Sequence, residues 1–376
     1  MPEIKFINVS KHYNHGKVMA IDNLNLTIKD GEYLSLLGPS GCGKTTTLRM
    51  IAGLILPTSG TILWDGKPIE HLSASDRDVG YVFQQFAIFP HLNVWDNIAF
   101  GAQVRENSSE QIEQIVEDKM SVVGLSDKAN RFPANLDAAD LQRIGIARVL
   151  ATGARTLLLD EPMGALDHKI REKFQDELAG IVKNLDLTAI HVTHDQSEAM
   201  AISDRIGVMK KGKMIQIGSP NDLLFNPTQI FTAHFIGEAD FMEGVVAKID
   251  SHSIGIELIG DEKIVIPRDG QVRLNPTMYE KVVIGLRREF GQIINYNEEH
   301  VGKENILTGK VQSDRFLGEK RRTVVNIDFG RSIEIKRNPL EQSYSKGDKV
   351  MISIPTGNAF LFSNPPHGLE NALSVT

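Results

Sequence analysis

The residues with the clearest chemical potential form one loop: Gly38, Pro39, Ser40, Gly41, Cys42, Gly43, Lys44, Thr45 and Thr46. Its three glycines allow a tight turn with backbone N–H groups directed inward, as a bound phosphate chain requires. Lys44 can then reach the β- and γ-phosphates, and the Thr45 hydroxyl can bind Mg²⁺. An apolar stretch, residues 33–37, precedes the loop, and a helical pattern over residues 48–56 follows it. The sequence therefore predicts a P-loop between a strand and a helix, with the positive helix end directed at the anion.

Two acidic residues follow another apolar stretch. Asp160 and Glu161 come directly after Leu157-Leu158-Leu159, the pattern of a buried parallel strand that delivers acids at its carboxyl edge. In a chain with a P-loop, Asp160 is placed to hold Mg²⁺ through water and Glu161 to polarise the attacking water. The alternative for either residue alone is an acid at the start of a helix. The pair beside a P-loop favours hydrolysis of a bound nucleotide.

Three more polar residues lie between predicted strands or at their ends. Tyr13 lies between strands predicted over residues 4–9 and 20–28, and its ring could stack on adenine or simply pack on a hairpin. Gln84 ends a buried strand and leads into an aromatic loop that contains a proline. His194 ends another apolar strand, where it can hydrogen-bond a γ-phosphate or play a structural part.

Composition limits the class of protein. A chain of 376 residues exceeds what one core usually holds, so two domains are expected. The formal charge of −7 argues against nucleic acid as the main partner. The single cysteine, Cys42, excludes a disulfide framework and fits a reducing cytosol, and its place at a helix start predicts a lowered thiol pKa. We expect no signal sequence and no apolar run of roughly 20 residues, so membrane contact would go through another protein.

The remaining patterns suggest how the chain is divided. Residues 96–128 are rich in charge and have helical spacing, which predicts a helical insertion over about residues 96–152. From about residue 243, short alternating apolar runs are separated by glycine, proline, asparagine and aspartate. We therefore expect an α/β P-loop NTPase domain with a helical insertion over residues 1–237, and an all-β domain over residues 238–376.

Taken together, these motifs resemble those of ATP-binding-cassette ATPases. The P-loop is joined, in the order and approximate spacing of that family, by Tyr13, Gln84, Asp160-Glu161-Pro162, Ala165-Leu166-Asp167 and Thr193-His194-Asp195. Residues 82–91, 218–220 and 235–237 look like the importer subunits that serve sugars, polyamines or ferric iron. The tail is similar to the OB-like regulatory domain of that class. The family's usual Arg-Pro-Glu is here Arg287-Arg288-Glu289.

The resemblance implies an ATPase that uses ATP and Mg²⁺ to power solute import. It implies catalytic roles for Glu161, His194 and Gln84, and adds Gln84 to Thr45 and Asp160 around the metal. It also implies a dimer of ATP-binding subunits, with Asp167 at the interface, on the cytoplasmic face of the membrane. The expected partners are membrane-spanning permease subunits, which the Gln84 loop would touch, and indirectly an extracytoplasmic solute-binding protein.

One segment departs from the family. The signature Leu-Ser-Gly-Gly-Gln, which caps the γ-phosphate on the opposite subunit, is replaced by Leu136-Asp137-Ala138-Ala139-Asp140, although Gln142-Arg143 follows as usual. The substitutions remove a hydroxyl donor and both glycines, and we expect both aspartates to repel a partner's phosphate. Asp137 is a good helix N-cap, so the helix itself should form with its anion site blocked.

Two hypotheses follow from this departure. In the first, the chain hydrolyses ATP in an importer and works opposite a different subunit with an intact signature. In the second, it is a homodimeric, slow or non-hydrolysing ATP-binding module whose β domain regulates another process. Relatives in DNA repair or translation are disfavoured because the chain has no long coiled-coil insertion, no second P-loop and no basic stripe.

Overall fold

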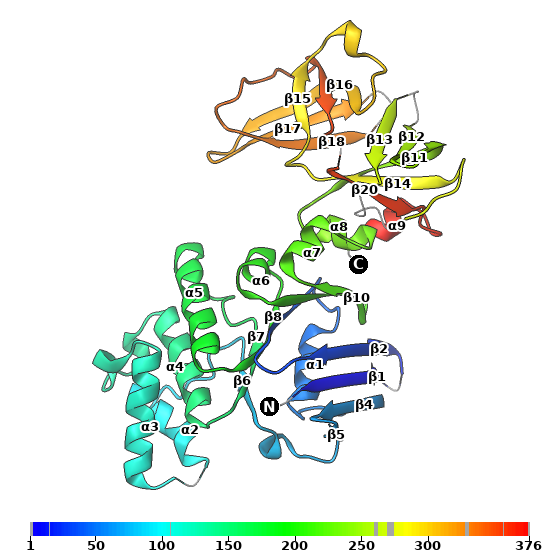
Figure 1. The fold of residues 1–376 in the computed structure, drawn as a ribbon. Helices are drawn as coiled ribbons and strands as arrows, with labels where there is room; N and C mark the ends of the chain where they lie inside the picture. The colour runs from blue at the N-terminus through cyan, green and yellow to red at the C-terminus, as the bar shows by residue number, and fades with distance from the viewer. Residues whose placement is uncertain are drawn as a thin grey trace. The chain divides into compact units, whose positions relative to one another are not determined.

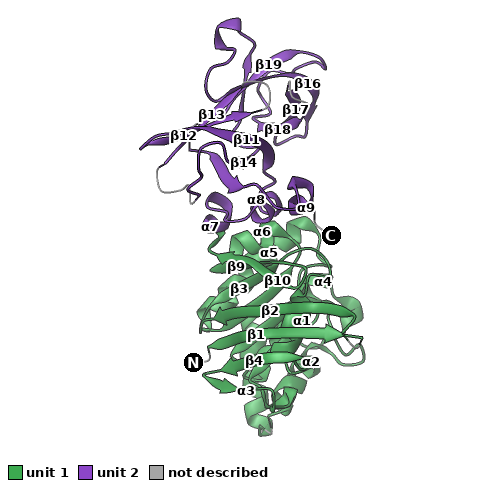
Figure 2. Cartoon of the chain, turned by 90° about the vertical axis from the view of Figure 1, so that its right-hand side faces the viewer, with its two compact units in different colours: residues 1–220, 376 green, residues 221–375 purple. Residues whose placement is uncertain are grey.

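The computed structural model describes residues 3–14, 16–105, 107–258, 262–268, 274–327, 331–355 and 357–374. The chain forms two compact units, residues 1–220 with 376 and residues 221–375, which Figure 2 shows in green and purple. Within the described part of the chain, every helix is too short or too polar to cross a bilayer.

A six-stranded sheet forms the centre of the first unit (Figure 1). Its strands, in spatial order, are β10 (Lys213–Gly218), β9 (Arg205–Lys210), β3 (Tyr33–Leu37), β8 (Thr188–Thr193), β7 (Thr156–Asp160) and β6 (Val79–Val82). All run parallel except β10, which is antiparallel to β9. Strands β3, β7 and β8 are buried at every residue, which explains their mainly apolar sequences. Their shared direction brings the chain segments that follow them to one edge of the sheet.

A second, antiparallel sheet completes the strands of this unit. Its order is β2 (Val18–Ile28), β1 (Ile4–Tyr13), β4 (Ser59–Trp64) and β5 (Lys67–Pro68). Helix α1 (Lys44–Ile51) begins within the glycine-rich loop and is shorter than the pattern over residues 48–56 predicts. It ends early because Gly53 adopts a left-handed conformation with φ of 75°, which stops the helix.

A helical segment follows β6 in the chain. It comprises α2 (Val94–Gln103), α3 (Ser109–Val122) and α4 (Ala138–Ala151), whose apolar faces share one core. In Figure 1 these helices gather at the left of the first unit, with β6–β8 between them and the strands β1, β2 and β4. The expected α/β fold with a helical insertion is confirmed. Helices α5 (His168–Asn184) and α6 (Gln196–Ile202) follow β7 and β8.

The second unit is built from two five-stranded antiparallel sheets. One has the order β13 (Lys263–Pro267), β12 (Ser253–Leu258), β11 (Asp240–Ile249), β14 (Lys281–Leu286), β20 (Ala359–Ser363). The other has the order β15 (Gln292–Asn295), β19 (Lys349–Ser353), β16 (Ile306–Phe316), β17 (Arg321–Ile327), β18 (Ser332–Arg337). Apolar side chains of both sheets form a common core. Helices α7 (Pro220–Phe225), α8 (Ile230–Phe235) and α9 (Leu369–Leu373) complete the unit, and the expected β domain is confirmed.

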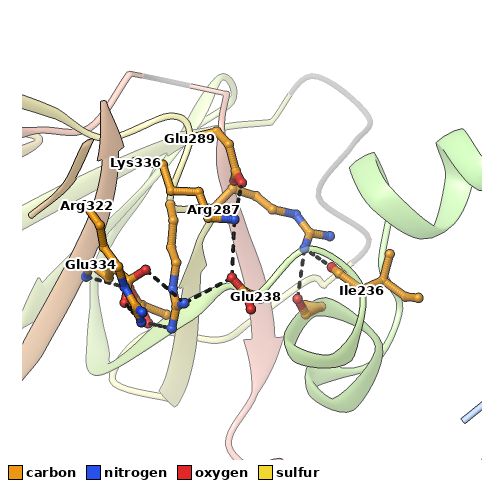
Figure 3. Close-up of polar contacts among 10 residues, drawn as sticks. Ile236, Glu238, Arg287, Glu289, Arg322, Glu334 and Lys336 are labelled. Atoms are coloured by element: carbon orange, nitrogen blue, oxygen red, sulfur yellow. Dashed lines mark hydrogen bonds and ion pairs between the residues drawn. The ribbon is translucent and has the colours of Figure 1, made fainter. Parts of the chain in front are cut away.

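The Arg287-Arg288-Glu289 segment forms hydrogen bonds and ion pairs within this unit (Figure 3). Arg287 is 2% exposed and donates hydrogen bonds to backbone carbonyls at the ends of α7 and α8, those of Leu224, Ala233 and Ile236. Burial lowers the pKa of Arg287 to about 10. The Arg288 guanidinium lies 3.1 to 3.3 Å from carboxylate oxygens of three residues, Glu238, Asp240 and Glu334. A proline at this position could not make these ion pairs.

Candidate nucleotide site

Two glycines of the glycine-rich loop lie in close contact with the backbone of other segments. A Cβ at Gly38 would lie 2.3 Å from the carbonyl oxygen of Met209. At Gly43, where φ is 109°, a Cβ would lie 2.6 Å from that of Ala20. Both positions therefore require glycine. Lys44 is 6% exposed, and its Nζ donates to the carbonyls of Gly38 at 2.6 Å and Pro39 at 3.0 Å, which keeps the ammonium on the loop.

The thiol in this loop corrects one prediction. Cys42 is 4% exposed, and burial raises the pKa of its thiol even though the Lys44 ammonium, 3.9 Å away, opposes that shift. The expectation of a lowered pKa is wrong because desolvation of the thiolate outweighs the nearby positive charge.

Asp160 is the last residue of β7 and lies where the loop can reach it. Its carboxylate accepts hydrogen bonds from the Thr45 hydroxyl at 3.0 Å and from the Tyr81 hydroxyl at 2.8 Å. The hydroxyl and carboxylate oxygens of Thr45 and Asp160 suit Mg²⁺, which binds through one or two such groups and otherwise keeps water and phosphate oxygens. The described residues form no cluster of three or more His, Cys, Asp or Glu side chains able to hold a metal. The donor set therefore fits a metal bound together with a phosphate.

Glu161 is the centre of a second polar group. Its backbone adopts a left-handed conformation with φ of 49°, and its N–H donates to the carbonyl of Val192 at 2.9 Å. Its Oε2 accepts from the amide of Gln84 at 2.9 Å and lies 3.4 Å from Nδ1 of His194. The His194 side chain is 63% exposed, so it can also meet a ligand. A strained backbone at a residue with such contacts is typical of a functional site.

Tyr13 lies at the end of β1, paired with Val18 of β2. The same hairpin carries Ala20, whose carbonyl closes over Gly43 of the loop. The Tyr13 ring is half-buried and has the Lys11 ammonium 5.2 Å from its centroid. Its stacking on adenine stays a prediction.

Two residues with contacts at this site escaped the sequence analysis. Tyr81 holds Asp160, as described above. Arg171, on α5, donates to the carbonyl of Leu166 at 2.9 Å and to the carboxylate of Asp195 at 3.1 Å. It therefore ties the Ala165-Leu166-Asp167 loop to the Thr193-His194-Asp195 loop. Neither residue belongs to a motif, and only the strand and helix placement brings it to the site.

The segment that replaces the family signature lies at the start of α4. Asp137 is exposed and acts as N-cap, accepting a hydrogen bond from the backbone N–H of Asp140 at 2.8 Å. Asp140 is 3% exposed, and its carboxylate lies 2.6 Å from Nζ of Lys128 and 3.2 Å from Nη1 of Arg143. The expectation that both aspartates repel a partner's phosphate is therefore wrong for Asp140, because its charge is buried and paired within its own chain.

The comparisons with known proteins agree with this geometry. A family model described as ABC transporter matches residues 21–164. The spermidine/putrescine import ATP-binding protein PotA of Thermotoga maritima is 36% identical over 89% of this chain and 89% of its own length. That of Acidothermus cellulolyticus is 35% identical over 98% of this chain and 94% of its own length.

Solved structures are similar over the first part of the chain. The protein cbiO1 from Clostridium perfringens, part of the ABC transporter complex cbiONQ, aligns with a TM-score of 0.56 and 30% identity over 58% of this chain and 89% of that one. The ATP-binding cassette MJ0796 bound to ADP and Pi aligns with a TM-score of 0.52 and 32% identity over 58% of this chain and 98% of that one.

The fold and the site define a P-loop ATPase that binds ATP. The chain belongs to the ABC transporter family, among the ATP-binding subunits of importers. It is an ATP-hydrolysing subunit that powers import, and the alternative of a homodimeric, slow or non-hydrolysing ATP-binding regulatory module is not favoured.

Proposed function

We propose that the chain supplies ATP hydrolysis for polyamine import, from the cytoplasmic face of the membrane, through membrane-spanning permease subunits. The solute class is supported by relatives named for spermidine and putrescine import that match along most of this chain. An extracytoplasmic solute-binding protein would deliver the solute to the permease. The observation that supports hydrolysis most directly is the Gln84–Glu161–His194 group, which directly follows Asp160 with its hydrogen bond from Thr45.

In the proposed mechanism one group of residues binds the nucleotide and its metal. Residues 38–46 bind the phosphates, Lys44 adds positive charge to them, and Tyr13 stacks on the adenine. Thr45 and Asp160, with Gln84, would hold Mg²⁺, which when bound neutralises charge on the β- and γ-phosphates.

Glu161, Gln84 and His194 act on the attacking water and the γ-phosphate in this mechanism. Glu161 polarises the attacking water and takes its proton, in a position fixed by the backbone hydrogen bond to Val192. Gln84 orients the Glu161 carboxylate, and the exposed imidazole of His194 binds the γ-phosphate.

The proposed dimer pairs this chain with a different ATP-binding subunit that has an intact signature. The argument is that α4 starts with its own carboxylate, Asp137, where the family places a serine hydroxyl for the partner's γ-phosphate. Ala138 and Ala139 add side chains where the family has glycine. The P-loop, Glu161 and His194 of this chain would complete one competent site with the partner's signature, and the other site would be defective. Asp167 would lie at this interface.

Two variants test the assignment. Lys44→Ala should weaken ATP binding by more than about 10-fold, because Lys44 acts on the bound phosphates. Glu161→Gln should keep ATP binding and slow turnover in the complete transporter about 100-fold or more, because it acts only on the attacking water. Glu117→Gln, at an exposed position of α3, is the matched control.

Titration with a fluorescent nucleotide measures binding, and phosphate release in reconstituted vesicles measures turnover. Parental turnover by Glu161→Gln would rule out the catalytic assignment. The solute assignment requires that spermidine or putrescine, with its binding protein, stimulates phosphate release, and a stimulation by another solute class alone would exclude it.

A further inference from the structure

The carboxylate assigned to the metal site is held from both sides. Its Oδ1 accepts from Thr45 at 3.0 Å, and its Oδ2 accepts from the hydroxyl of Tyr81, on β6, at 2.8 Å. Asp160 is 8% exposed, so little water reaches it to replace either donor. Rotation of the carboxylate would therefore break a hydrogen bond without compensation.

The donor hydroxyl is itself oriented. Arg49 lies one helical turn after Thr45 on α1, and the positive charge of its side chain acts on the Tyr81 hydroxyl. The phenol donates its proton to Oδ2 of Asp160, since the ionised carboxylate can only accept. The Phe83 ring, 4.5 Å away between centroids, packs against the Tyr81 ring.

We propose that Tyr81 is a positioning residue for Mg²⁺-dependent nucleotide binding, because it fixes the Asp160 carboxylate that faces the metal. The inference rests on the proposed function, which assigns Asp160 to Mg²⁺. Residues that orient metal ligands typically change metal affinity or activity by about 10- to 100-fold when they are replaced. Tyr81 has this relation to Asp160, although no motif includes it.

The test measures how much Mg²⁺ strengthens ATP binding to the full chain. The dissociation constant of ATP is determined with excess Mg²⁺ and with a chelator, and the ratio of the two is the Mg²⁺ effect. Tyr81→Phe should reduce this ratio about 10-fold and leave the affinity measured with chelator at the parental value. Tyr33→Phe is the matched control, because it also removes a buried hydroxyl from this sheet, one that lies 3.3 Å from Nδ1 of His191. Its ratio should equal the parental one.

The outcomes separate the inference from the proposed function. Asp160→Asn should abolish most of the Mg²⁺ effect, and if it does not, the metal assignment and the inference both fail. If Asp160→Asn does so while Tyr81→Phe keeps the parental ratio, only the role of Tyr81 is overturned. An equal loss in Tyr33→Phe would also overturn it, since the effect would then be a general one of packing. Should Tyr81→Phe not fold, Tyr81→Leu, which also removes the hydroxyl and keeps an apolar side chain beside Phe83, must lower the ratio, and a parental ratio there refutes the proposal.

Discussion

Removing the Asp140 carboxylate should destabilise the first unit without touching the nucleotide site. Its side chain is 4% exposed and meets Lys128 at 2.6 Å and Arg143 at 3.2 Å. Breaking a buried ion pair by deleting one partner costs about 3–5 kcal/mol when the remaining charge is also buried. Lys128 and Arg143 keep 23% and 19% exposure, and Arg143 retains Glu177 at 2.7 Å. We therefore expect Asp140→Asn to lower the free energy of unfolding by about 2–3 kcal/mol.

Urea unfolding followed by tryptophan fluorescence measures this loss. Trp95 lies on α2 against the core that α4 shares, so a Trp64→Phe background leaves one reporter near the change. Asp118→Asn is the control, because that carboxylate is 60% exposed and its pair with Lys119 should contribute less than about 1 kcal/mol. A loss below about 0.5 kcal/mol in Asp140→Asn would refute the conclusion that this carboxylate is an internal ion-pair partner.

Three other measurements follow from the structure. Burial lowers the pKa of His191 from 6.5 to about 3, so between those values the unfolded chain binds a proton that the folded chain does not. Stability should therefore fall as pH decreases through this window, by up to about 1.4 kcal/mol per pH unit, and His191→Gln should flatten a plot of urea midpoint against pH. Cys42 should react slowly with thiol reagents both with and without MgATP, because it is buried, and rapid labelling of the free chain would contradict that burial. Arg171→Met should lower kcat about 10- to 100-fold with a smaller change in KM, and Arg171→Lys should recover part of it, since the residue positions the loops beside Glu161. If Arg171→Met lowers both kcat and the free energy of unfolding, and Arg171→Lys recovers neither, Arg171 has only a structural role.

Much of the candidate site could be predicted because its chemistry is local in sequence. The P-loop needs its glycines and lysine within a few residues, and Asp160-Glu161 ends an apolar strand. Parallel strands then place their carboxyl ends together, so Gln84 and His194 meet Glu161 without any contact being read from the sequence. The β domain was recognised on the same basis, because alternation with a period of two is also a local signal.

Contacts made by residues outside the motifs could not be predicted. Tyr81 and Arg171 have no motif, and each acquires its role only from the strand or helix that carries it. Their partners lie on other elements, β7 for Tyr81 and the loop before α6 for Arg171. The order of strands in the β domain could likewise not be predicted from the sequence, since each apolar run can pair with several others.

Two wrong predictions have one physical cause. The position of Cys42 at a helix start can be predicted from the sequence, but its burial cannot, and burial raises the thiol pKa. The negative charge of Asp140 at the signature segment is likewise visible in the sequence, but its direction is not, and in the structure the carboxylate lies against Lys128 and Arg143. Position along a helix is visible in sequence, whereas the solvent exposure that decides the electrostatics is not.

The two aspartates of the signature segment therefore have different consequences. Asp137 is exposed at the helix start, so its charge is the one that a partner's γ-phosphate would meet. Asp140 stabilises the fold through its ion pairs, and a glutamine at this position would leave Lys128 and Arg143 without the negative charge they pair with. Restoring Asp137→Ser, Ala138→Gly and Ala139→Gly while keeping Asp140 should thus raise the ATPase activity of the isolated chain, because donors return and the cations stay paired. Adding Asp140→Gln should lower stability as in Asp140→Asn. If the unmodified chain, free of any partner, already hydrolyses ATP as fast as the restored one, Asp137 does not block the site and pairing with a different subunit loses its main support.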